Sequence, residues 1–288
     1  MKRTVLFMAG ILILAGFLVS QTTEFERERE AIKAAALDYI EGAHEGNADR
    51  IARSVHTELC KVSVRKLPQT GKEVLYKAGF SRLAELVRAN AVPLAPEERH
   101  IEITILAVRE GLACAKAVSS MFYDDLQLAK IDGTWKLINV LWRYNPSHPN
   151  GKVQGDPPDI DEEKAAIEKT AMNYLEGSFS GDADRMAAAV HPELNKVIPV
   201  TLPQTKTTML NYTPAGLLIE GTRAKMGLVD EDKRDIRFKM LDLQNEIAMV
   251  EVLSSMYYDY LQLAKLNGQW KIVNVLWKMN PDAPRPKR

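Results

Sequence analysis

The sequence predicts an α+β fold built twice, as two tandem domains that each place three helices before an antiparallel sheet. The first observation is a repeat, because Tyr39-Ile40-Glu41-Gly42 returns as Tyr174-Leu175-Glu176-Gly177, 135 residues further on. The second is a change of hydrophobic period within each copy, from that of a helix to that of a strand. A repeat of this length is a whole domain, since solenoid units run to about 20–50 residues.

The N-terminal segment 1–20 is typical of an export signal. Lys2-Arg3 supplies a positive charge, and an uncharged apolar run follows from Thr4 to Val19. This run is shorter than the roughly 20 residues of a membrane-spanning helix. Ser20 offers a cleavage point, although Leu18 fits the small-residue cleavage pattern poorly, so an uncleaved anchor is the alternative. We expect a signal peptide at 1–20 and an extracytoplasmic protein, periplasmic or secreted, without membrane contact once the signal is removed.

The first part of each copy has the spacing of helices. Apolar residues share one helical face at Ile32, Ala36, Tyr39, Ile40 and Ala43. Gly46 and Gly181 follow, where a helix can end in a left-handed residue. Asn47 and Asp182 then predict the N-caps of a short second helix. Thr213-Pro214 predicts the start of a third, with proline at the first helical position.

From Ile101 onward, apolar and polar residues alternate as in strands. Asp132-Gly133 and Asn267-Gly268 predict hairpin turns of the primed type. The last strand is apolar on both faces, and alternation assigns one face to Trp135, Leu137, Asn139 and Leu141. One face can pack on the helices of its own domain, and the other needs a partner. The sequence therefore predicts an intramolecular pseudo-dimer, packed sheet to sheet.

The domain boundaries follow from the repeat. We expect one domain at 24–145 and the second at 159–280. Between them, 146–158 is rich in proline and glycine and is predicted to be a linker. The basic, proline-rich segment 281–288 is predicted to be a frayed tail.

Composition limits the classes of function. Lys+Arg and Asp+Glu both number 38, which argues against a strongly basic nucleic-acid-binding surface. The two cysteines, Cys60 and Cys114, both lie in the first copy. An oxidising compartment would permit a disulfide between them, and two buried free thiols are the alternative.

The C-terminal part of each copy resembles a known family. In the second copy the similarity is carried by the run from Tyr258 to Lys265 and by Asn267-Gly268-Gln269-Trp270-Lys271 through Trp277. The matching runs of the first copy are 123–130 and 133–142. These motifs are similar to the nuclear transport factor 2-like (NTF2-like) superfamily, and within it to putative lumazine-binding proteins, close to the SnoaL-like polyketide cyclases.

The resemblance implies two cone-shaped domains, each with three N-terminal helices and a curved antiparallel sheet around a pocket, usually paired through the sheets. It implies no reaction, because the superfamily includes isomerases, dehydratases, cyclases and proteins without catalysis. The chain departs from the family at Gln127 and Gln262, where histidine is usual, and at Val62 and Val197, where arginine is usual. Thr57 replaces the proline of a His-Pro motif.

Two pairs of residues are candidates for catalysis. His56 and His191, each two residues before a glutamate, could act as general bases, or could simply hold a loop. Asp124 and Asp259 lie on a strand among aromatic residues, where burial would raise the carboxyl pKa and favour proton abstraction. The alternative is an aspartate on a solvated face or one bonded to a bulge. Strand alternation puts these aspartates on the face opposite Gln127 and Gln262.

The candidate ligand-binding residues are aromatic or polar and occur in both copies. They are Tyr174, His191, Gln262, Trp277, Tyr39, His56, Gln127 and Trp142. Aromatic residues at such spacings also serve as core packing. No spacing of histidine and cysteine indicates a metal site, and no motif indicates a cofactor.

These observations lead to three hypotheses about the function of the protein. The first is an exported binding protein without catalysis, which holds a small, flat, partly apolar molecule in each cone. The second is a proton-transfer isomerase, dehydratase or cyclase, and the third is an interaction module whose cones are filled by side chains. We also expect the second copy to be the more functional one, because it keeps His191-Pro192 and has Tyr260 where the first copy has Asp125.

Overall fold

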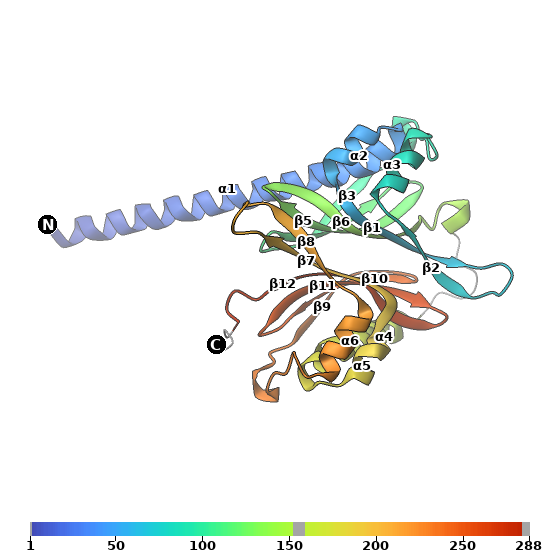
Figure 1. Ribbon diagram of the computed structural model, residues 1–288. Coiled ribbons are helices and arrows are strands. Elements are labelled where there is room, and N and C mark those ends of the chain that lie inside the picture. The colour runs from blue at the N-terminus through green and yellow to red at the C-terminus, as the bar shows by residue number, and fades with distance from the viewer. Residues whose placement is uncertain (1, 152–158, 284–288) are drawn as a thin grey trace.

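The computed structural model describes residues 2–151 and 159–283, with the backbone alone for residues 2–23. Two domains lie one above the other, with their sheets facing each other and their helices on the outside (Figure 1). Part of the predicted linker and most of the predicted tail lie outside the described residues.

Both domains have the same order of elements. The first contains α1 (Lys2–Glu45), α2 (Ala48–Ser54), β1 (Val55–Lys66), β2 (Glu73–Ala78), α3 (Phe80–Arg88), the 3₁₀ turn η1 (Pro96–Glu98), β3 (Glu102–Arg109), β4 (Leu112–Val118), β5 (Phe122–Ile131), β6 (Thr134–Tyr144) and η2 (Pro149–Gly151). The second contains α4 (Ile160–Ser180), α5 (Ala183–Ala189), β7 (Val190–Thr201), β8 (Thr208–Thr213), α6 (Ala215–Arg223), η3 (Glu231–Lys233), β9 (Arg237–Gln244), β10 (Ile247–Leu253), β11 (Tyr257–Leu266) and β12 (Gln269–Met279).

Most local signals in the sequence correspond to observed caps and turns, but Pro214 is the N-cap of α6 and not its first helical residue. The side chain of Asn47 accepts a hydrogen bond from the Arg50 amide, and Asp182 caps α5 in the same way. Gly181 ends α4 with φ of 74°. In the hairpin at Asp132-Gly133 both residues have positive φ, as the primed turn type requires.

Each sheet is mixed, where an antiparallel sheet was expected. The strand orders are β2-β1-β6-β5-β4-β3 and β8-β7-β12-β11-β10-β9. The central pairs β1–β6 and β7–β12 run parallel, and the other pairs are antiparallel. The hairpins β1–β2 and β7–β8, which come before the third helix of each domain, were not predicted from the sequence. Charged residues spread along Val55–Lys66 obscure the alternation in this strand.

A β-bulge corrects the predicted phase of the last strand. Leu128 pairs with Leu137 and Gln127 pairs with Asn139, so Ile138 is the extra residue. Trp135 and Leu137 pack into the core of their own domain. Beyond the bulge the alternation is reversed, and Asn139 faces the other domain instead of sharing their face.

The sheet-to-sheet pairing predicted from the sequence is confirmed. Two buried clusters combine residues of both domains, such as Ile138 with Leu276, and Leu141 with Val273. Polar contacts cross the interface in pseudo-symmetric pairs. Gln127 Nε2 donates to the Tyr260 carbonyl at 2.8 Å, and Gln262 Nε2 donates to the Asp125 carbonyl at the same distance.

The hairpins β1–β2 and β7–β8 reach across to the opposite domain. Next to the turn of the first hairpin, the Glu73 amide donates to Asn267 Oδ1 at 2.9 Å. At the matching place in the second, the Thr208 amide donates to Asp132 Oδ1 at 2.8 Å. Each hairpin is therefore hydrogen-bonded to a β-turn of the other domain, and these contacts fix the two domains relative to each other.

The N-terminal helix α1 begins at Lys2, continues through the predicted cleavage point and extends away from both domains (Figure 1). Among the described residues, no helix is both long and apolar enough to cross a membrane. The export signal stays a prediction.

The two cysteines are free thiols in this fold. Cys60 pairs with Asn139, Asn139 with Gln127, and Gln127 with Cys114, so the cysteines are three strands apart. Three strand spacings give about 14 Å. A disulfide needs Cα atoms within about 7 Å, and the bridge considered from the sequence is therefore excluded.

Candidate functional site

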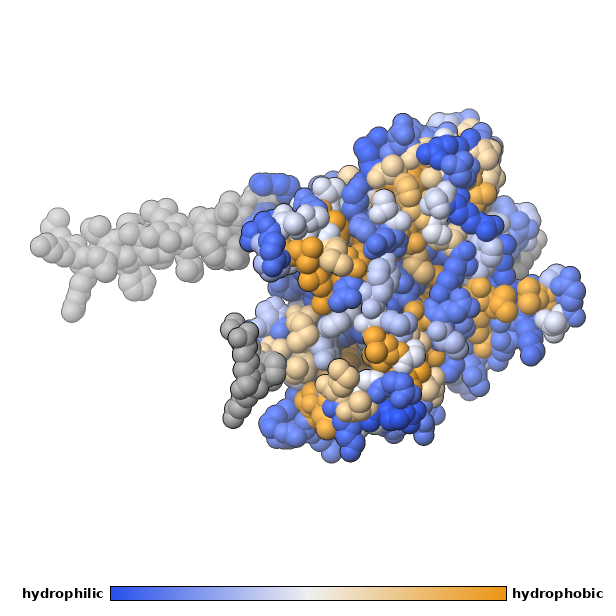
Figure 2. Space-filling model, in the orientation of Figure 1, coloured by the Kyte–Doolittle hydropathy of each residue, from blue (hydrophilic) through white to orange (hydrophobic). Residues whose placement is uncertain are grey.

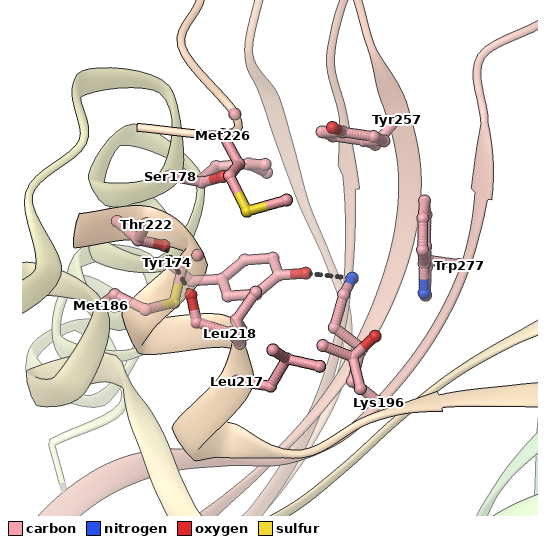
Figure 3. A pocket seen from close by; sticks show the side chains of 14 residues that line it. Tyr174, Ser178, Met186, Lys196, Leu217, Leu218, Thr222, Met226, Tyr257 and Trp277 are labelled. Carbon is pink, nitrogen blue, oxygen red and sulfur yellow. Dashed lines mark hydrogen bonds between the residues drawn. The ribbon is translucent and has the colours of Figure 1, made fainter. Parts of the chain in front are cut away.

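The second domain contains a cavity of about 380 Å³ between its helices and the concave face of its sheet. Its walls are mainly apolar and aromatic (Figure 3). Leu217, Leu218 and Met226 come from α6 and the segment after it, while Tyr257 and Trp277 come from β11 and β12. A volume near 300–1,000 Å³ is typical of small-molecule sites.

One polar cluster lies in the wall of this apolar cavity. Lys196 Nζ donates to the hydroxyl of Tyr174 at 2.6 Å and lies 3.5 Å from Asp259 Oδ1 (Figure 3). The Tyr174 hydroxyl in turn donates to Asp259 Oδ1 at 2.9 Å. Helix α4, β7 and β11 each supply one member, so the cluster joins the helical layer to the sheet.

Burial dominates the electrostatics of this cluster. Asp259 is 1% exposed and the Lys196 side chain is 8% exposed. Burial raises the pKa of Asp259, and this effect is opposed by Lys196 and Tyr174. Burial also lowers the pKa of Lys196, and Asp259 opposes that shift. Each charge therefore depends on the other to remain ionised.

Aromatic rings surround the ammonium group. Lys196 Nζ lies 4.1 Å from the centre of the Trp277 ring, within the range of a cation–π contact. Tyr257 meets Trp277 edge to face at 5.4 Å. Trp277 also has a buried Nε1 with no hydrogen-bond partner among the described residues. The cavity thus combines flat walls with N–H donors.

The first domain repeats the arrangement around a smaller cavity of about 220 Å³. Lys61 Nζ lies 2.8 Å from Asp124 Oδ1, and the Tyr39 hydroxyl donates to the same oxygen at 2.8 Å. Lys61 Nζ is 4.7 Å from the centre of the Trp142 ring. The lysine–tyrosine–aspartate cluster therefore has the same arrangement in both domains, although many other positions differ between them.

The cluster can donate a hydrogen bond to a ligand. A lysine ammonium carries three N–H donors, and in each domain tyrosine and aspartate engage two of them. The third is available to an acceptor atom of a flat molecule between the rings. Because lysine and aspartate neutralise each other, the cluster itself does not demand a charged ligand.

Asp124 and Asp259 lie on the cavity side of their sheets, and Gln127 and Gln262 lie on the other side. Strand alternation predicted the opposite faces but not which pair faces the cavity. Neither carboxylate is among the groups that line the cavities, because tyrosine and lysine cover them. Their sequence-based role as general bases would require direct contact with a substrate proton. Among the described residues that line the two cavities there is no carboxylate that could act as this base.

His56 and His191 lie outside both cavities, at the start of β1 and β7. In each, Nδ1 accepts a hydrogen bond at 3.1 Å from the amide two residues further on, at Glu58 and Glu193. Burial lowers the pKa of both histidines. This is the loop-holding arrangement that was the alternative to catalysis.

Gln127 and Gln262 belong to the domain interface, where their side chains bond backbone carbonyls of the opposite domain. Asp125 and Tyr260 also face the interface, since they alternate with the cavity-facing Asp124 and Asp259. Replacement of tyrosine by Asp125 therefore removes no wall of the first cavity, and this reason for ranking the second copy higher is wrong.

The sequence reading missed Lys61 and Lys196 as site residues. Of the predicted ligand-binding residues, the structure brings Tyr39 and Trp142 together around Lys61, and Tyr174 and Trp277 around Lys196. A signal was present, because a lysine recurs at an offset of 135 residues and is followed by valine in both copies.

Comparison with known proteins agrees with this architecture. The family model described as putative lumazine-binding matches residues 27–143 and 162–278. The fold is that of two tandem NTF2-like domains, and the chain belongs to the putative lumazine-binding family. Comparison with curated proteins gave no match.

Solved structures similar to one domain include an NTF2-like protein of unknown function from Silicibacter pomeroyi, with 18% identity over 43% of this chain and 100% of that one, at a TM-score of 0.35. A putative scytalone dehydratase from Novosphingobium aromaticivorans has 16% identity over 48% and 96%, with a TM-score of 0.34. A ketosteroid isomerase-like protein from Erwinia carotovora has 16% identity over 42% and 98%, with a TM-score of 0.28. Likeness at this level concerns fold alone.

Proposed function

We propose that this protein binds small molecules without catalysis, and that each cone holds one flat, partly apolar ligand. The ligand places a hydrogen-bond acceptor against the lysine and its ring system between the aromatic walls. The observation that carries the proposal is the buried lysine, which lies in the wall of a mainly apolar cavity in both domains. The description of the family names lumazine, which is a flat bicyclic molecule of the size that the second cavity accommodates.

The alternatives have less support. A proton-transfer enzyme needs a base in contact with substrate, whereas the carboxylates lie behind tyrosine and lysine, and the histidines lie outside the cavities. A module with filled cones would lack the cavity of the second domain, whose volume of about 380 Å³ lies within the range of small-molecule sites. The binding hypothesis is also consistent with the lysine–aspartate pair, because the two opposite charges together are neutral and can be buried in an apolar wall.

The binding proposal is tested by titration with 2-naphthamide, a neutral, flat molecule with one carbonyl acceptor. Trp142 and Trp277 line the cavities, so binding should change tryptophan fluorescence. The variant Lys196→Met/Asp259→Asn removes donor and counter-charge together and should lose binding in the second cavity. Lys169→Met, which removes an exposed lysine of α4, is the matched control. Equal titrations of all three proteins would contradict the proposal.

We also propose that the chain is exported through its N-terminal segment, with cleavage before Gln21. The support is the order of positive charge and apolar run described above. Mass spectrometry of the protein recovered from outside the cytoplasm should find an N-terminus at Gln21. Full-length protein confined to the cytoplasm would contradict export.

A further inference from the structure

The two cavities differ most at their mouths, and we propose that the first cavity selects flat aromatic carboxylates while the second takes uncharged ligands. This inference rests on the proposed function, because it assigns a ligand class to each of the two sites. The cores of the sites are alike, so the difference in selectivity must come from residues above the lysine–tyrosine–aspartate cluster.

Two guanidinium groups lie at the mouth of the first cavity. The Arg65 guanidinium lies 3.6 Å from the centre of the Tyr76 ring, and that of Arg82 lies 5.0 Å from the same centre. Arg65 and Tyr76 line the cavity. Tyr76 therefore holds both guanidinium groups beside the cavity that it lines, through the contact with aromatic faces that arginine favours.

These arginines have no carboxylate partner among the described residues. Nearby, Glu85 pairs with Arg88, and Asp124 is taken by Lys61 and Tyr39. The mouth of the first cavity therefore carries two uncompensated positive charges. Guanidinium groups bind carboxylates through paired N–H donors, so an anionic group at the entrance would find complementary charge.

Three aromatic rings in contact with one another also line the first cavity. Phe122 meets Trp142 edge to face at 5.3 Å and stacks with Tyr144 at 5.8 Å. Aromatic rings prefer such offset and edge-to-face contacts with another ring. A flat ligand whose aromatic ring packs on these rings, and whose carboxylate accepts from Lys61 and also faces the arginines, would satisfy both parts of the site.

The second cavity has lost these charges. The positions of Arg65, Tyr76 and Arg82 are occupied there by Val200, Asn211 and Leu217, as read from the repeat. Gly221 replaces Leu86, so the second cavity lacks these side chains, and it is the larger of the two.

The rim of the second cavity is apolar instead. Leu217 is 62% exposed and Met226 is 81% exposed, and both line the cavity. Figure 2 shows hydrophobic side chains on the surface of the second domain near α6. An entrance of this kind offers no charge to an anion, which would lose its hydration there without compensation.

The inference is tested by comparing 2-naphthoate with 2-naphthamide, which have nearly the same shape and differ in charge. In full-length Lys196→Met/Asp259→Asn, only the first cavity has its cluster intact. There, 2-naphthoate should bind about tenfold more tightly than 2-naphthamide, which corresponds to about 1.4 kcal/mol. The preference should shrink at about 1 M salt, where the Debye length falls to about 3 Å.

Two sets of substitutions locate the source of the preference. When Arg65→Val and Arg82→Leu are added to Lys196→Met/Asp259→Asn, the dissociation constants of 2-naphthoate and 2-naphthamide should become nearly equal. In Lys61→Met/Asp124→Asn, which keeps the second cluster, adding Val200→Arg and Leu217→Arg should create a preference for 2-naphthoate. Circular dichroism and thermal melts establish that each variant is folded.

The outcomes separate this inference from the proposed function. If the first cavity binds both probes equally, or keeps its preference without the arginines, the assignment of charge selectivity is wrong while binding stands. Loss of both probes on removal of the arginines would show that they act as walls, and would also overturn it. If the wild-type protein binds neither probe, the proposed function itself fails.

Discussion

Substitution of Cys60 by asparagine should stabilise the protein, because it would complete at Asn274 the hydrogen-bond chain that already exists at the pseudo-symmetric Asn139. In that chain, Asn195 Nδ2 donates to Asn139 Oδ1 at 2.7 Å, and Asn139 Nδ2 donates to Gln127 Oε1 at 2.8 Å. At the pseudo-symmetric place, Asn274 donates to Gln262 at 2.7 Å, but Asn274 Oδ1 has no donor in the part of the chain that the structure describes. Cys60 stands where Asn195 stands in the other copy.

The magnitude follows from the burial of the unpaired oxygen. Asn274 is fully buried, at 0% exposure. An unsatisfied buried polar group costs about 1–3 kcal/mol, and part of this gain is offset because asparagine is larger than cysteine. A net gain of about 1 kcal/mol would raise the melting temperature by roughly 2–4 °C in a chain of this size.

Differential scanning calorimetry of four variants measures the effect. Cys60→Ala supplies no donor and should not raise the melting temperature. Asn195→Cys breaks the intact chain and should lower it, and Cys60→Asn/Asn195→Cys should lie near the wild type, because one bond is gained and one is lost. A destabilising Cys60→Asn together with a neutral Asn195→Cys would refute the reasoning.

Three further predictions concern charge and the hairpin arms. The pKa of Asp125 is raised, mainly by burial and next by the negative charge of the nearby Asp242. With respect to this group, the folded protein is therefore most stable below the unfolded pKa of about 3.9, where Asp125 is protonated, and this stability is lost as pH rises through the folded pKa. Asp125→Asn should therefore raise the melting temperature near pH 8 and much less near pH 4; an equal effect at both would contradict this. Lys196→Met leaves Asp259 buried without its cation and should cost about 3–5 kcal/mol in urea unfolding, with a smaller loss in Lys196→Met/Asp259→Asn; equal losses would show that the charge is not the cause. Asn267→Ala removes the side chain that holds the Glu73 backbone and should increase amide hydrogen exchange in β2, while unchanged exchange would mean that the arm is held elsewhere.

The repeat explains why so much of the fold could be predicted. Local signals such as Asn47, Gly181 and Asp132-Gly133 act within a few residues, and the repeat showed each of them twice. The hairpins β1–β2 and β7–β8 could not be predicted in this way, because the opposite domain supplies contacts to them. The bulge at Ile138 also escaped, since it depends on the register between β5 and β6 and leaves no mark in the alternation of the sequence.

The candidate site was predicted in part. Tyr39, Tyr174, Trp142 and Trp277 were expected from their repetition and aromatic character, and the structure places them in the cavity walls. Lys61 and Lys196 were missed because a charged residue in a strand is usually solvated, and only the fold brings aspartate and tyrosine to them. The roles of His56, His191, Gln127 and Gln262 depend on which way their strands face, which no local pattern reports.

Native mass spectrometry of 2-naphthamide bound to the full-length chain tests most directly whether the paired cavities are ligand sites built around the two lysines. The wild type should bind two molecules per chain. Lys61→Met/Asp124→Asn and Lys196→Met/Asp259→Asn should each bind one, and their combination should bind none. A wild type that binds no probe, or a stoichiometry that stays the same across all four proteins, would contradict the account.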